Sequence, residues 1–213
     1  MRNNKKVPAS PVPENKYKKF KLQLEEYSDI YSERNLMLFV LGIATGFRTQ
    51  DLVDLTIADL KEAIEEEELI IQEKKQLNIY KRHIKENPGS RKKKPEARGV
   101  KIKSNLLKLL KQYCKHKKRS EYAFRSNKGG GREHITAKAY SNILSEVAKI
   151  EGLKNISGHS MRKTYARRLW ESTQDLEFVR KNLGHKNIET TQRYLGLDRE
   201  IMDDAAEIVD DRL

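Results

Sequence analysis

The sequence predicts a mainly α-helical domain with a small antiparallel β-sheet, an α+β fold. Two observations lead to this prediction. Apolar residues recur every three to four positions through most of the chain, which places them on one face of a helix. Between residues 69 and 102, two short apolar stretches flank a polar segment, which is typical of two strands that return on each other. The 213 residues suit one good-sized domain with at most a small appendage.

The first part of the chain predicts an arm followed by helices. Prolines among Asn, Lys and Ser predict a flexible basic arm over residues 1–15. Apolar residues at helical spacing then run from 17 to 27. Ser32 is a typical N-cap for a strongly apolar helix over 36–44, which Gly46 ends. The next helix has three inward apolar residues, Leu52, Val53 and Leu55.

The middle of the chain predicts a long β-hairpin with a flexible, basic tip. Four glutamates at 65–68 form a solvated turn before a strand at 69–71. Residues 74–103 are densely basic, and Pro88 with Gly89 marks a turn. A returning strand at 100–102 closes the hairpin.

Helical spacing dominates the remainder. Thr136 caps a helix that reaches about residue 150, and Gly184 separates two short helices near the C-terminus. The inward residues of the helix after Thr136 are Ile143, Leu144, Val147 and Ile150. The other expected segments are helices at 106–113, 160–171, 176–183 and 190–195, a loop at 124–131, and an acidic amphipathic helix at 198–213. Residues 16–197 therefore form one domain between the arm and the last helix.

The charge of the chain points to a polyanionic partner. Lys and Arg total 44 against 31 Asp and Glu, for a net charge of +13. Such a field attracts polyanions, and nucleic acid is the commonest of these. A merely soluble basic surface is the plainer alternative.

The remaining composition narrows the setting. A single cysteine, Cys114, excludes a disulfide within the chain and a cysteine-based zinc site, and it fits a reducing cytoplasm. No segment approaches the length of a membrane span, and residues 1–10 lack the apolar core of a signal peptide. We expect a cytoplasmic, DNA-associated protein.

A first cluster of polar residues lies on the turn after the apolar helix, with the sequence Thr-Gly-Phe-Arg-Thr-Gln-Asp at 45–51. Arg48 offers a planar fork that suits a phosphate, and Asp51 lies one helical turn on, where it can orient Arg48. An exposed arginine–aspartate pair is the alternative for this cluster alone.

A second cluster, Gly-His-Ser-Met-Arg-Lys-Thr at 158–164, begins a helix. His159 and Arg162 are three residues apart and share one face. Because two cations repel each other and a helix N-terminus favours anions, the pair makes most sense facing an anion. The alternative is a capped helix with scattered basic residues.

A third cluster spans 183–194, with the sequence Leu-Gly-His at its start and Arg-Tyr at its end. His185 lies on a turn, and Tyr194 follows nine residues later on a short helix. By itself Tyr194 is indistinguishable from an ordinary core tyrosine.

Together, in this order and spacing, the clusters resemble the catalytic domain of the tyrosine recombinases, the phage integrase family. That family has T-G-x-R-x-x-D/E, a hairpin lysine, H-x-x-R, L-G-H, and a tyrosine nine residues after that histidine. Each element has a match here, and the resemblance covers residues 16–197. Because separated elements must coincide in order, their combination is far more specific than any one of them.

The resemblance implies strand cleavage without metal or cofactor. Tyr194 attacks the scissile phosphate, a 3′-phosphotyrosyl link forms, and a 5′-hydroxyl leaves. Cationic side chains take the role that Mg²⁺ plays in other phosphoryl-transfer enzymes. The implied roles are phosphate binding by Arg48 and Arg162, hydrogen bonding by His159 and His185, proton acceptance by His159, leaving-group protonation by Lys75 with Lys74 as the second choice, and support of the arginines by Asp51.

The implied partner is double-stranded DNA, with a homo-oligomer assembled on it, a tetramer on DNA and a monomer when free. The expected DNA-binding residues are basic side chains of the hairpin and of the second cluster: Lys74, Arg91, Lys92, Lys93, Lys94 and Lys163. The family commonly has a further N-terminal DNA-clamping domain, so this is either a fragment or a naturally minimal recombinase. Without a clamp, affinity depends on phosphate contacts and falls steeply with salt.

The final helix has two possible positions. An apolar stripe, Leu197, Ile201, Ala205 and Ile208, can pack on a neighbouring subunit, as the resemblance implies, or fold back on its own domain.

Two other functions remain open. The same chemistry serves a nicking-closing topoisomerase that needs no defined site, and the same fold can serve a DNA-binding protein without activity. The presence of Tyr194 argues against the second, because a pure binder has no need of it.

Overall fold

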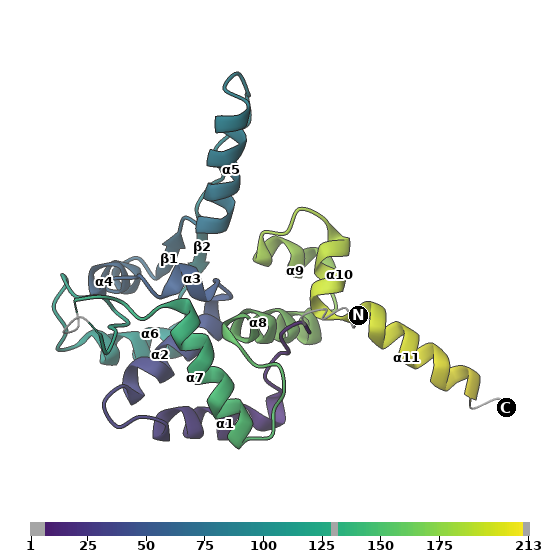
Figure 1. Cartoon of the computed structure of the whole chain (residues 1–213), viewed down its shortest axis with the longest axis horizontal. Helices are drawn as coiled ribbons and strands as arrows, with labels where there is room; N and C mark the ends of the chain where they lie inside the picture. Colours follow the sequence, from purple (N-terminus) through teal and green to yellow (C-terminus); the bar gives the residue numbers. More distant parts are fainter. Residues whose placement is uncertain (1–6, 129–131, 211–213) are drawn as a thin grey trace, which may run out of the picture.

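The computed structural model describes residues 7–128 and 132–210 and confirms the expected class. Helices pack around a central helix, with a small two-stranded sheet at one side (Figure 1). The central helix is α2 (Ser32–Thr45), which packs against α1 (Glu14–Glu26), α6 (Ser104–Cys114) and α8 (Gly158–Thr173). Helix α7 (Ala137–Ile150) packs against α1 and α8 and begins, as expected, at a capping Thr136.

Helix α2 is central because it is apolar on nearly every side, which is the pattern of a buried helix. Leu38, Phe39 and Leu41 are completely buried. The helix begins at Ser32 itself, so this residue is not the cap that its type suggests. Gly46 ends the helix with a φ of 64°, and a Cβ there would lie 2.3 Å from the Tyr165 ring. Only glycine therefore allows both the turn and the close approach of α8.

The sheet lies beside two short helices. Helix α3 (Thr49–Leu52) is a single turn, and α4 (Ile57–Glu65) begins with a capping box between Thr56 and Asp59. Strand β1 (Glu68–Ile71) pairs antiparallel with β2 (Arg98–Lys101), so that Leu69 faces Val100. The pairing of the two strands is confirmed.

The connection between the strands is not the predicted β-hairpin. Residues Lys74–Glu86 form a helix, α5, that projects from the body, and an irregular segment at 87–97 returns to β2 (Figure 1). Leu77, Tyr80 and Ile84 lie on one side of α5 at spacings of three and four residues. That spacing, without Gly or Pro before residue 88, is helical, and the high lysine content obscures it.

The C-terminal part forms a separate small layer. Helices α9 (Leu176–Leu183) and α10 (Ile188–Leu195) end at Gly184 and Gly196, both with positive φ. Their apolar residues pack with the end of α8 in a second cluster built on Ala166, Val179 and Leu183, distinct from the large main core. We call residues 176–195 the tyrosine segment.

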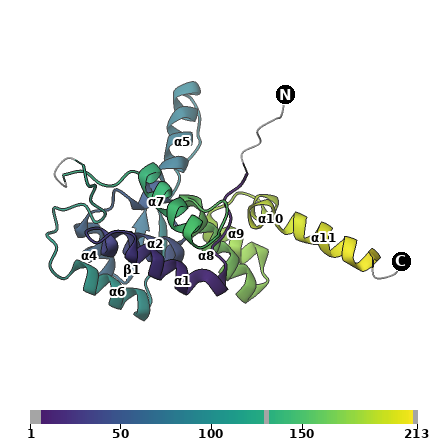
Figure 2. The ribbon, with the colours of Figure 1, turned by 60° about the horizontal axis from the view of Figure 1, so that its bottom comes forward.

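The two ends of the described chain lie differently with respect to the body. Residues 7–13 follow the body closely: the Val12 amide donates to Thr164 Oγ1 at 2.8 Å, and the Val12 side chain is buried. Helix α11 (Leu197–Asp210) extends away from the body in both views (Figure 1, Figure 2), with Ile208 and Val209 exposed. The expected stripe residue Ile201 has a side chain outside the described set.

Two further details complete the fold. Ile150, expected to face inward, is 60% exposed because it ends α7 beyond the core. Across the described ranges, every helix is too short or too polar to cross a lipid bilayer.

Candidate active site

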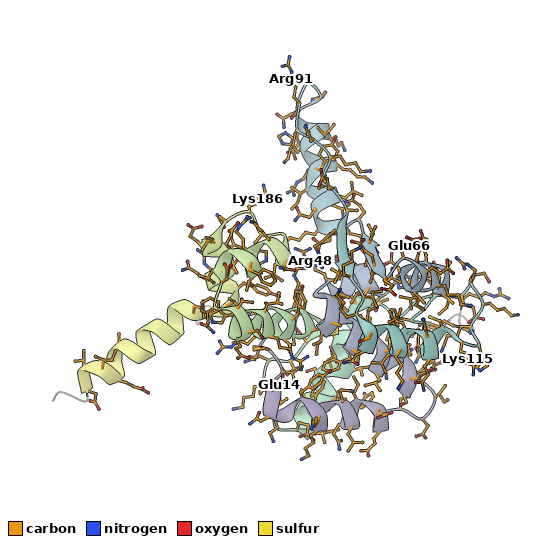
Figure 3. The ribbon with its side chains drawn as sticks, turned by 180° about the vertical axis from the view of Figure 1, so that it is seen from behind. Glu14, Arg48, Glu66, Arg91, Lys115 and Lys186 are labelled. Atoms are coloured by element: carbon orange, nitrogen blue, oxygen red, sulfur yellow. The ribbon has the colours of Figure 1, made fainter. Side chains whose placement is uncertain are left out.

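The three polar clusters meet where the body faces the tyrosine segment. Arg48 precedes α3, His159 and Arg162 lie in the first turns of α8, and His185 lies between α9 and α10. Figure 3 places Arg48 centrally, between the root of α5 and the tyrosine segment. Elements more than a hundred residues apart in sequence thus bring these side chains together.

A buried carboxylate, Glu73, holds the two motif arginines. Its oxygens lie 2.7 Å from Arg48 Nη1 and 3.1 Å from Arg162 Nη1. Burial acts to raise the pKa of Glu73, but Arg162, Arg48 and Arg98 outweigh it, so the pKa is lowered. Glu73 is therefore ionised and fixes the spacing of two cations that would otherwise repel each other.

A third arginine, Arg98 on β2, completes this network. Its Nε lies 3.7 Å from Glu73 Oε1, and its guanidinium stacks 3.8 Å from the centre of the Phe47 ring. Burial, with the repulsion of Arg162, lowers its pKa to about 10, so Arg98 stays charged at neutral pH. We call Arg48, Glu73, Arg98 and Arg162 the arginine network.

The arginine network also joins the body to the tyrosine segment. Arg162 donates to the carbonyls of Gly46, at 2.7 Å, and of Leu183. Arg98 donates to the carbonyls of Thr45, at 3.2 Å, and of Asn182, at 3.0 Å. These carbonyls belong to the C-terminal ends of α2 and α9, which are the ends that favour cations.

Glu73 and Arg98 lie outside the three sequence clusters. Glu73 directly precedes the candidate lysines, and Arg98 lies in the returning strand, but neither has a neighbour in sequence that marks it as buried. Strand pairing provides the only signal, because it sets Ile71 opposite Arg98 and so brings Glu73 to the same end of the sheet.

Asp51 does not take the predicted position against Arg48. Its buried carboxylate accepts a hydrogen bond of 2.9 Å from the Lys74 backbone N–H. Burial raises the pKa of Asp51, and the hydrogen bond from Lys74 partly opposes that rise. Asp51 thus supports the start of α5, while the carboxylate that contacts Arg48 is Glu73.

The two candidate lysines have different surroundings. Lys74 Nζ is paired with the Asp54 carboxylate and donates to the Gln50 carbonyl at 3.2 Å. Lys75 is exposed and lines a cleft of about 550 Å³ together with Arg48 and His159. The geometry therefore brings Lys75, and not Lys74, to the cleft that Arg48 and His159 line.

Both motif histidines are held in their neutral form. Burial, followed by the cations Arg162 and Arg48, lowers the pKa of His185 to about 4. Burial and then Arg48 also lower the pKa of His159. Gly158 lets the first turn of α8, which carries His159, lie close to α3, because a Cβ at Gly158 would be 2.7 Å from Thr49 Oγ1. A neutral imidazole can accept a proton, which is the role expected of His159.

Tyr194 reaches the same place from α10. Its ring meets that of His185 edge to face at 5.3 Å, and Lys163 Nζ lies 5.2 Å from the ring centre. Its hydroxyl is buried without a hydrogen-bond partner among the described residues. Burial raises the pKa of Tyr194 to about 12, although Arg162 and Arg48 oppose the rise, so the resting tyrosine is protonated.

The expected DNA-binding residues fall into two places. Arg91, Lys92, Lys93 and Lys94 are exposed in the segment after α5, and Figure 3 shows Arg91 at its far tip. Lys163 instead lies beside Tyr194, in a cleft of about 360 Å³ shared with His159, and burial lowers its pKa. Within the described ranges, His, Cys, Asp and Glu form no group of three arranged to hold a metal ion.

The chain is similar in sequence to known proteins. The model of the phage integrase family matches residues 14–200. The chain is 26% identical over 178 residues to the probable integrase/recombinase YoeC of Bacillus subtilis, covering 84% of this chain and 86% of YoeC. It is 30% identical over 195 residues to the tyrosine recombinase XerC of the same organism, covering 90% of this chain but 59% of XerC.

Among solved structures, the integrase of transposon Tn1549, in complex with a circular intermediate DNA, has the same fold. Its TM-score is 0.65 at 17% identity, over 90% of this chain and 63% of that one. The chain thus spans about three fifths of that solved chain and of XerC. The match of the family model over most of its length shows that the chain belongs to the phage integrase family.

Proposed function

We propose that this protein is a site-specific DNA recombinase or integrase that cleaves and rejoins strands through a 3′-phosphotyrosyl intermediate. The observation that carries the proposal is that His159 lines two clefts, one with Arg48 and Lys75 and the other with Tyr194. Glu73 joins Arg162 to Arg48 beside them. XerC and the Tn1549 integrase are named as enzymes of this class. A net charge of +13 suits the DNA backbone.

The arginines stabilise the charge that builds on the phosphate during attack. Arg162 uses three of its five N–H groups on Gly46, Glu73 and Leu183, which fixes its plane and leaves donors for a phosphate oxygen. Arg48 lies across Glu73 from it. A preorganised pair of this kind loses little free energy to reorganisation when the charge develops.

Protons move in opposite directions at the two ends of the reacting phosphate. The bond from Tyr194 Oη to phosphorus forms as the tyrosine proton passes to neutral His159. The bond from phosphorus to the 5′ oxygen breaks, and that oxygen takes a proton from Lys75. The phosphotyrosyl link conserves the energy of the broken bond, so rejoining needs no nucleotide.

A nicked suicide substrate tests the proposal. Wild type accumulates a covalent protein–DNA adduct, and Tyr194→Phe abolishes it, while Tyr122→Phe serves as a matched control on another face. An adduct that persists in Tyr194→Phe, or no adduct on any DNA, would overturn the proposal. Relaxation of arbitrary supercoiled plasmid would favour the topoisomerase, and binding without an adduct would favour the non-catalytic binder.

We also propose that the protein acts as a homo-oligomer on DNA. Exposed Ile208 and Val209 on the projecting α11 support this, because apolar residues on an isolated helix favour a protein surface. Ile208→Asp should reduce the mass of the DNA complex in sedimentation without changing half-site binding. An unchanged mass would contradict a role for α11 in assembly.

A further inference from the structure

The projecting arm formed by α5 and residues 87–97 differs from the rest of the molecule. No residue of α5 is buried, and the arm stands clear of the body in two views (Figure 1, Figure 3). Its basic residues far outnumber its acidic residues, Glu86 and Glu96. A helix of 13 residues without a fully buried side chain is marginal on its own, so a partner surface would stabilise the arm further.

One face of α5 continues the active-site cleft outward. Lys75, Asn78, Ile79 and Arg82 lie at helical spacings of three and four residues and all line the cleft with Arg48 and His159. Ile79 is 40% exposed. In the described structure, the Asn78 and Arg82 side chains have no hydrogen-bond or ion-pair partner, so their donors and acceptors are free for a ligand.

The opposite side of α5 is covered by the arm itself. His83 Nε2 contacts Ser90 Oγ at 2.9 Å, which holds the returning segment against the helix. Leu77, Tyr80 and Ile84 on that side are half-buried. The face of α5 that carries Tyr80 is therefore covered, and the face that carries Asn78 and Arg82 is exposed and lines the cleft.

We propose that Asn78, Ile79 and Arg82 read base edges in the DNA major groove beside the cleaved phosphate. The inference rests on the proposed function of the same cleft. A major groove admits an α-helix, asparagine pairs with adenine, arginine pairs with guanine, and an apolar side chain contacts the thymine methyl. Lys75 and the exposed lysines of the arm contact phosphates and so position the helix without selecting sequence.

The length of the α5 face from Lys75 to Arg82 limits how many base pairs it can contact. Lys75 and Arg82 are seven residues apart, which is about 10 Å along a helix. That distance corresponds to about three base pairs of DNA. The selected bases therefore lie within about three base pairs of the cleaved phosphate.

The test selects DNA from a pool randomised over the base pairs that flank the cleavage position. Asn78→Ala and Arg82→Ala relax the preference at one or two of these positions by about tenfold, while the other positions keep theirs. Lys81→Ala is the matched control, because it removes the same charge from the adjacent position of the same helix but lies outside the cleft. It weakens binding evenly across sequences.

The selection is run twice, on covalently captured DNA with wild-type Tyr194 and on reversibly bound DNA with Tyr194→Phe. An unchanged preference in Arg82→Ala and Asn78→Ala, or the same change in Lys81→Ala, overturns the inference. If wild type forms no adduct, but Asn78→Ala and Arg82→Ala still relax the base preference in the reversible selection, the readout is supported and the proposed cleavage is overturned. Circular dichroism checks that the helix persists, which alanine favours.

Discussion

The arginine network and the tyrosine segment are held in place in different ways. Glu73, Arg98 and Arg162 are fixed by ion pairs and carbonyl contacts beside the main core, and Glu73 and Arg162 are nearly fully buried. The tyrosine segment rests on the small cluster around Val179 and Leu183. The electrostatic part of the site therefore has more contacts that fix it, and the part that carries Tyr194, the proposed nucleophile, has the smaller share of the protein's packing.

The join between the two regions is mostly polar. Arg98 and Arg162 hold the tyrosine segment through the backbone carbonyls of Asn182 and Leu183. Any displacement of α9 breaks bonds to Arg162, one of the two arginines proposed to bind the phosphate. The difference between the regions suggests that nucleophile position and phosphate binding are coupled through these carbonyls, and four predictions test or sharpen it.

The largest expected effect on the cleavage rate distinguishes Lys75, which lines the cleft, from Lys74, which is paired with Asp54. Lys75→Ala should slow strand cleavage by about 10²–10⁴-fold, because the 5′ oxygen then leaves without an acid. Lys74→Ala, which removes the pair with Asp54, should slow it far less. Rates of adduct formation measure both.

A substrate with sulfur at the 5′ bridging position gives the control, because a thiolate leaves without protonation. It should restore the rate of Lys75→Ala toward wild type. Equal defects in the two lysine variants, or no rescue by sulfur, would show that Lys75 is not the acid.

Removing the charge of Glu73 should destabilise the arginine network. Glu73→Gln leaves buried Arg162 and partly buried Arg48 and Arg98 without their counter-ion, and we expect a loss of about 3–5 kcal/mol in the free energy of unfolding. Glu68→Gln breaks an exposed pair with Lys101 on the neighbouring strand and should cost less than about 1 kcal/mol. Urea denaturation measures both, and equal costs would contradict a special role for Glu73.

A cavity should affect the two regions differently. Leu183→Ala, in the small cluster, should cost about 2–3 kcal/mol and raise amide exchange in the tyrosine segment alone. Leu38→Ala, in the main core, should lower protection throughout the body. If Leu183→Ala lowers protection across the whole chain instead, the two regions unfold as one unit.

The smallest effect is a pH dependence. Because the pKa of His159 lies below its ordinary value of 6.5, the neutral base persists at mildly acidic pH. Cleavage should stay level down through pH 6.5 and then fall by about tenfold per pH unit as the imidazole takes a proton. His159→Asn should be slow and lack this acid limb, and the exposed His116→Asn should retain it. An acid limb retained in His159→Asn would assign it to another group.

Local patterns in the sequence predict most helices and the motif residues. They fail where contacts between distant segments determine the conformation or the partner of a residue. Thr136 and Gly46 mark helix ends because their effects act within one turn. Residues 74–86 are misread as part of a long β-hairpin, since the many lysines and other polar residues of this helix obscure the helical spacing of its few apolar residues. Asp51 is misassigned because its spacing from Arg48 allows a contact that Glu73 takes instead.

The sequence by itself determined the family, the cation and tyrosine motifs, and the likeness to enzymes that cut DNA. Those conclusions need only the identity and order of residues, because chemistry resides in side chains. Only the tertiary structure decided that Glu73 and Arg98 complete the site, that Lys75 and not Lys74 faces the cleft, and that the Tyr194 hydroxyl is buried at rest. These depend on which distant segments pack together, and burial sets the charge balance and pKa of each group there.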